Sequence, residues 1–143
     1  MAPEDLFGAA NMLALAGWVA LLASPLVPVW SQRIAGAAIP LLLAIAYAGI
    51  GLAFFAGADG GFGDLAGVMS LFDDPWVTLG GWIHFLAFDL FVGAWIVRRA
   101  REEEVAFLLV VPCLALTFMF GPAGFLAFSA IRLARGGFRS VFP

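Results

Sequence analysis

The chain has 143 residues, of which 64% are hydrophobic and only 12% are charged, and its formal net charge is −3. A soluble domain of this length cannot bury so much apolar surface, and it normally carries about twice this share of charge. The seven basic residues are all arginines without an extended basic patch, so the composition excludes a nucleic-acid-binding protein and predicts an integral membrane protein.

The first two predicted helices are both long enough to cross a bilayer. The first covers about residues 6–24 and ends where two prolines stop helix propagation. Glu4 and Asp5 precede it, and negative charge is favourable at a helix N-terminus. An acidic start is not typical of a cleavable signal peptide, so we expect this helix to be retained. The second predicted helix covers about residues 34–56.

A glycine-rich loop separates these helices from the third predicted span. Residues 65–72 follow the loop and place apolar side chains on one face, which predicts a short interfacial helix. Asp74 and Pro75 are a typical N-cap and first residue of a helix. The third predicted helix therefore covers about residues 76–98, and it ends in an arginine cluster suited to a layer of lipid headgroups.

The fourth predicted helix covers about residues 105–132, which is longer than one bilayer crossing. Gly121 and Pro122 interrupt it, so we expect one tilted helix that is kinked at these two residues. With four full crossings, the arginines divide three against four between the two sides and give no orientation by the positive-inside rule. In an alternative topology the chain turns back after Gly121, and all seven arginines lie on one side.

The expected architecture is thus an all-α integral membrane protein with a bundle of about four transmembrane helices. No linker or internal repeat divides the chain, so we expect a single transmembrane domain that comprises residues 1–143.

Two ionisable residues, His84 and Asp89, lie near the middle of the third predicted span. Ionisable groups are costly in hydrocarbon and therefore indicate a function by default. Five residues at about 100° each separate the two side chains by roughly 140° on a straight α-helix, so they would face different neighbours. One extra residue in a π-bulge would bring them onto nearly the same face. The sequence leaves both arrangements open.

Aromatic residues accompany this pair along the third helix. An aromatic wall beside a proton-transfer group suits a long, flat, conjugated ligand, although the same rings could simply pack against lipid or neighbouring helices. An asparagine in the first helix and a tyrosine in the second are further candidates, with interhelical packing as the alternative. The candidate substrate-binding residues are Asn11, Tyr47, Trp82, Phe85 and Phe88.

Other chemistry finds no support in the sequence. Cys113 is the single cysteine and His84 the single histidine, which makes no convincing set of metal ligands. Phosphate-binding glycine loops, serine-nucleophile motifs and c-type haem motifs are absent from the sequence. We therefore expect no metal and no cofactor.

Three short motifs resemble the neoxanthin synthase family of small membrane proteins, also called abscisic-acid-deficient-four-like. They are Gly81-Trp82-Ile83-His84, Asp89-Leu90-Phe91 and Gly121-Pro122-x-Gly124, and the resemblance covers essentially the whole chain. It implies a four-helix membrane domain. The plant members are associated with converting violaxanthin to neoxanthin, an isomerisation in which an epoxide opens while a neighbouring carbon loses a proton. Such a reaction needs a base and an acid, for which Asp89 and His84 are the candidates in either order.

The chain departs from plant members in two ways. It lacks the chloroplast-targeting segment, and its all-arginine composition, rich in alanine and glycine, is typical of bacteria. We therefore predict a cofactor-independent isomerase in the bacterial inner membrane that takes a carotenoid or retinoid-type polyene from the lipid, with homo-oligomerisation left open. The alternative is a non-catalytic binding or assembly subunit that holds an isoprenoid pigment or a quinone, in which Asp89 would be fully paired and no cleft would exist.

Overall fold

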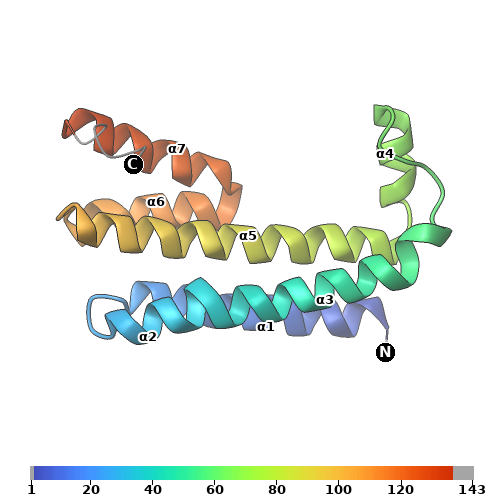
Figure 1. Ribbon diagram of the computed structural model, residues 1–143, viewed down its shortest axis with the longest axis horizontal. Coiled ribbons are helices and arrows are strands. Elements are labelled where there is room, and N and C mark those ends of the chain that lie inside the picture. The colour runs from blue at the N-terminus through green and yellow to red at the C-terminus, as the bar shows by residue number, and fades with distance from the viewer. Residues whose placement is uncertain (1, 137–143) are drawn as a thin grey trace.

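The computed structural model describes residues 2–136, which form helices joined by short loops (Figure 1). Within this range, three helical segments are long and apolar enough to cross a membrane, and they confirm the first three predicted spans, although the second begins six residues earlier than the predicted residue 34. These segments are Pro3–Leu22, Pro28–Gly57 and Pro75–Glu102.

The first two segments both begin at a proline, where the missing N–H costs the helix nothing. In α1 (Pro3–Leu22), the carboxylate of Asp5 accepts a hydrogen bond of 3.1 Å from the backbone N–H of Ala2. In the second segment a π-helical stretch precedes Pro40, whose ring would crowd the carbonyl four residues earlier in a regular helix. The parts of this segment are α2 (Pro28–Arg33), η1 (Ile34–Ala38), α3 (Ile39–Phe54) and η2 (Phe55–Gly57).

Two aspartate caps begin the next helices, as the sequence predicted for the second of them. Asp64 accepts a hydrogen bond of 2.7 Å from a backbone N–H in the first turn of α4 (Leu65–Phe72). Asp74 accepts bonds of 2.8 and 3.0 Å from two backbone N–H groups at the start of α5 (Pro75–Glu102). These caps satisfy N–H groups that a helix cannot pair internally, so both boundaries follow from local sequence.

The fourth apolar run is not the single kinked helix that we expected. It forms two shorter helices, α6 (Phe107–Phe120) and α7 (Pro122–Ala134), which lie side by side as a hairpin (Figure 1). Gly121 joins them with a backbone φ of +48°, a conformation that L side chains rarely adopt. The chain therefore turns back at Gly121, in agreement with the alternative topology.

The hairpin depends on close packing at its tip and an ion pair at its base. A Cβ on Gly124 would lie 1.9 Å from the Thr117 hydroxyl oxygen, so only glycine allows α7 to approach α6 this closely. At the base, the buried Arg132 donates to Glu103 from Nε over 2.7 Å. These contacts return the end of α7 to the level where α6 begins.

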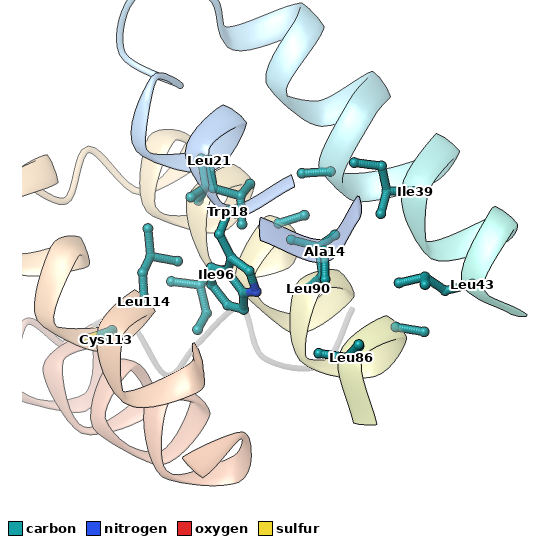
Figure 2. Packing of buried hydrophobic residues seen from close by; sticks show 14 of the residues in the cluster. Ala14, Trp18, Leu21, Ile39, Leu43, Leu86, Leu90, Ile96, Cys113 and Leu114 are labelled. Atoms are coloured by element: carbon teal, nitrogen blue, oxygen red, sulfur yellow. The ribbon is translucent and has the colours of Figure 1, made fainter. Parts of the chain in front are cut away.

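The central helix of the bundle is α5, which packs against α1, α3, α6 and α7. Glycines bring it close to α1, because a Cβ on Gly17 would meet Leu90 at 2.4 Å and one on Gly93 would meet Trp18 at 2.9 Å. Leucine, isoleucine and tryptophan side chains fill the space between these helices (Figure 2). These contacts fix the position of α5 relative to α1.

Charged residues divide between the two ends of the bundle. The acidic residues of α1 and those that precede α4 and α5 lie at the end where α1 and α5 begin (Figure 1), whereas Glu102, Glu103 and Glu104 lie where α5 ends. The arginines of the described range lie at the opposite end, where α5 and α7 finish and α2 runs. They are Arg33, Arg98, Arg99, Arg101, Arg132 and Arg135.

The positive-inside rule predicts the arginine end on the cytoplasmic side when the protein is expressed in a bacterial host. In a Cys113→Ala background, which has no other cysteine, we expect an Asp59→Cys variant to react with a membrane-impermeant maleimide in intact spheroplasts. An Arg101→Cys variant should react only after permeabilisation, since residue 101 lies at the arginine end. The reverse labelling pattern, or equal labelling of both, would contradict this orientation.

Candidate functional site

The two ionisable residues of α5 lie on different sides of the helix. The helix is α-helical from Pro75 to Glu102, so the five-residue spacing keeps His84 and Asp89 roughly 140° apart. The π-helical stretch occurs in the second segment, at Ile34–Ala38, and not between these two residues. Each of the two side chains lines a cavity of its own.

The cavity of Asp89, which we call the carboxylate cavity, has a volume of about 260 Å³. Helices α1, α5 and α6 form its walls, and its rim is exposed at Phe118 and Met119. The cavity is therefore open to the outer surface of the bundle. Its lining residues are Asn11, Trp18, Trp82, Phe85, Leu86, Asp89, Phe118 and Met119.

Asp89 lies at the tip of the α6–α7 hairpin and is only 8% exposed. A Cβ on Gly121 would lie 2.6 Å from its Oδ1, so the carboxyl group rests directly against the turn. The other oxygen, Oδ2, is buried and has no hydrogen-bond partner among residues 2–136. Buried polar atoms are nearly always paired, so this oxygen is available for a ligand or a proton.

An amide and an indole lie in the same cavity as Asp89. The Asn11 side chain donates a 2.7 Å hydrogen bond to the carbonyl of Phe7 and accepts one of 3.2 Å from the Trp82 Nε1–H. These two bonds fix the amide orientation. A carboxamide has two N–H groups, so Asn11 keeps one donor for a ligand oxygen.

The cavity of His84, which we call the imidazole cavity, has a volume of about 330 Å³ and lies between α3, α4 and α5. The His84 ring centroid is 5.3 Å from that of Tyr47 and 4.7 Å from that of Phe88. Its lining residues are Tyr47, Ile50, Gly51, Phe55, Phe62, Leu71, Phe72, Val77, Gly80, Gly81 and His84.

The residues that the sequence proposed as one site divide into two groups. Asn11, Trp82 and Phe85 join Asp89 in the carboxylate cavity. Tyr47 joins His84, and Phe88 stacks on His84 while lining an adjacent apolar depression. A paired action of His84 and Asp89 on one reacting group is therefore not supported, because the body of α5 separates their cavities.

Sequence reasoning missed the contribution of the hairpin tip to the carboxylate cavity. Phe118, Met119 and Gly121 lie far from Asp89 along the chain, and only the reversal at Gly121 brings them to it. The Gly121-Pro122-x-Gly124 motif was the available signal: it supplies the positive φ, a first helical residue and the close contact with α6. Among residues 2–136, no cluster of three or more His, Cys, Asp or Glu could hold a metal ion.

Comparison with known proteins gives one family. The model of the family described as ABA DEFICIENT 4-like matches residues 5–128, a range that includes every residue lining both cavities. No curated protein and no solved structure matches the chain.

The contribution of the turn at Gly121 to the stability of the protein can be tested by substitution. We expect Gly121→Ala to lower the free energy of unfolding by about 1–2 kcal/mol from its backbone conformation alone, with a further loss because the new Cβ meets Asp89. Thermal or denaturant unfolding in detergent micelles measures this change. The matched control is Gly49→Ala in α3, where a Cβ meets nothing within 4 Å and alanine should stabilise the helix by up to about 1 kcal/mol. Equal stability of the two variants would contradict a role of Gly121 in the turn.

Proposed function

The chain belongs to the ABA DEFICIENT 4-like family, and we propose that it is a membrane isomerase that moves a proton on a carotenoid or retinoid-type polyene through Asp89. Family membership and three apolar helices identify a membrane protein. The family connection to neoxanthin formation, carried by the His84 and Asp89 motifs, supports a polyene as substrate.

The unpaired carboxyl oxygen of Asp89 carries this proposal. An ionisable group in hydrocarbon is costly and is retained for a function or for pairing. Pairing does not account for Asp89, because its buried Oδ2 has no hydrogen-bond partner among residues 2–136 and lines a cavity open at its rim. The alternative of a non-catalytic holder required a fully paired Asp89 and no cleft, so these observations favour catalysis.

A single carboxyl group is sufficient for the proposed reaction, because an isomerisation releases and takes up the same number of protons. As carboxylate, Asp89 removes a proton from a carbon of the polyene. In an epoxide substrate, the electron pair of that C–H bond forms a new double bond while the neighbouring C–O bond breaks, and the electron pair of the C–O bond stays on oxygen as an alkoxide. The carboxylic acid then returns its proton to the alkoxide oxygen, which leaves Asp89 in its starting state. The substrate is neither oxidised nor reduced overall, so the reaction requires no electron donor or acceptor.

The other residues of the carboxylate cavity bind and orient the substrate in this proposal. Asn11, held by Phe7 and Trp82, offers its remaining N–H to the substrate oxygen, where negative charge develops. The apolar walls at Phe85, Phe118 and Met119 exclude water and pack against the conjugated chain. His84 has no part in this proton transfer, because it lies in the imidazole cavity.

We expect Asp89→Asn to lower isomerisation about 10²–10⁴-fold, since it removes the proton acceptor without changing the size of the side chain. The assay is expression in cells that accumulate candidate carotenoids or retinoids, followed by chromatography of the extracted polyenes. Asp59→Asn, in an exposed loop, is the control and should keep wild-type turnover. A fully active Asp89→Asn variant would sink the proposal, and pigment that co-purifies without any turnover would favour the non-catalytic holder.

The separation of the two cavities also predicts the turnover of a His84 variant. His84→Phe should keep turnover close to wild type in the same assay, because His84 does not line the carboxylate cavity. A loss as large as that of Asp89→Asn, in protein that is folded and present in equal amount, would show that both groups act on one substrate.

A further inference from the structure

The imidazole cavity presents two hydrogen-bonding side chains on the outer surface of the bundle. His84 and Tyr47 are both exposed, their rings contact each other at 5.3 Å, and neither makes a hydrogen bond within residues 2–136. Both lie in the apolar segments Pro28–Gly57 and Pro75–Glu102. Lipid tails offer no hydrogen bonds at this depth, so a bound molecule with an oxygen would stabilise this pair.

The shape of the imidazole cavity suits a flat ring. Phe72 of α4 lines the cavity, and the rings of Phe55 and Phe62, which also line it, stack on each other with centroids 5.5 Å apart. A Cβ on Gly51 would meet nothing within 4 Å, so the cavity reaches the backbone of α3 there. With walls from α3, α4 and α5, the space of about 330 Å³ is large enough for a ring.

A second depression of about 400 Å³ follows along the same seam between α3 and α5, and it is lined by apolar residues. It begins next to the imidazole cavity, because Phe88 stacks on His84 at 4.7 Å and Ala44 precedes Tyr47 by one helical turn. Four of its eight lining residues are glycine or alanine. Its lining residues are Gly36, Ala37, Pro40, Leu41, Ala44, Ala87, Phe88 and Phe91.

We propose that the α3–α5 seam is a second ligand site, which holds an isoprenoid with an oxygenated ring and an apolar tail. The ring lies in the imidazole cavity with its oxygen hydrogen-bonded to His84 and Tyr47, and the tail lies in the depression beside Phe88 and Phe91. Neutral imidazole and phenol both donate and accept, so a ring carbonyl or a ring hydroxyl meets the same pair. This site is independent of Asp89, which lies on another side of α5.

The test is a titration of purified protein in lipid nanodiscs with a short-chain prenylbenzoquinone, followed by quenching of tryptophan fluorescence. We expect saturable binding that His84→Phe and Tyr47→Phe each weaken about three- to tenfold, the effect of one hydrogen bond. The Cβ of a Gly51→Leu variant would meet nothing within 4 Å, and because Gly51 lines the cavity the rest of the leucine would occupy ligand space and should abolish binding. Gly49→Leu, which also points into open space but does not line the cavity, is the matched control and should bind as wild type.

Competition distinguishes the sources of the ligand. Displacement of the quinone by a polyene with a hydroxylated ring, with the same sensitivity to His84→Phe, would support the site with a xanthophyll-type ligand. Displacement only by other quinones would support it with a quinone. Equal competition by a ring-less isoprenoid hydrocarbon, or unchanged binding in Gly51→Leu, would overturn the proposal. Asp89→Asn should leave this binding unchanged, so the outcome is separate from that of the isomerase assay.

Discussion

The reversal of the chain at Gly121 is the constraint on which the rest of this structure depends. A positive φ at that residue, and the absence of a Cβ at Gly124, let α7 fold back along α6, so that the hairpin extends only part of the way across the bundle (Figure 1). The turn then lies against Asp89, and Phe118 and Met119, which precede the turn, line the carboxylate cavity. The same reversal returns Arg132 to Glu103 at the base of the hairpin, where the arginine also lies 5.9 Å from the Trp95 ring centroid.

The central position of α5 decides how the two ionisable residues can act. Neighbouring helices cover α5 along most of its length. The angle of a side chain around α5 therefore decides which cavity it lines. Asp89 faces α1 and the hairpin tip, whereas His84 faces α3 and α4. One helix therefore supplies a buried, unpaired carboxyl group to one cavity and an exposed imidazole to another. The proton-transfer site and the separate ligand site that we propose both depend on this division.

Much of the fold was predictable because its signals are local. Three spans follow from the length of their apolar runs, and the start of α5 follows from Asp74 and Pro75, whose cap involves only adjacent residues. The short helix α4 was predicted with its bounds at residues 65–72. Asn11, Trp82 and Phe85 are three of the five substrate-binding candidates that the sequence suggested for a single site, and they line the same cavity as Asp89.

The sequence by itself determined a membrane protein with three long apolar helices. It also identified His84 and Asp89 as functional candidates, because ionisable groups are costly in hydrocarbon. Only the tertiary structure decided that the fourth run turns back, because Gly121-Pro122 is compatible with both a kink and a reversal until α7 packs on α6. It also decided that the two groups lie in different cavities. Periodicity gives the angle between two side chains on one helix, but the neighbours that each one meets depend on residues distant in the chain.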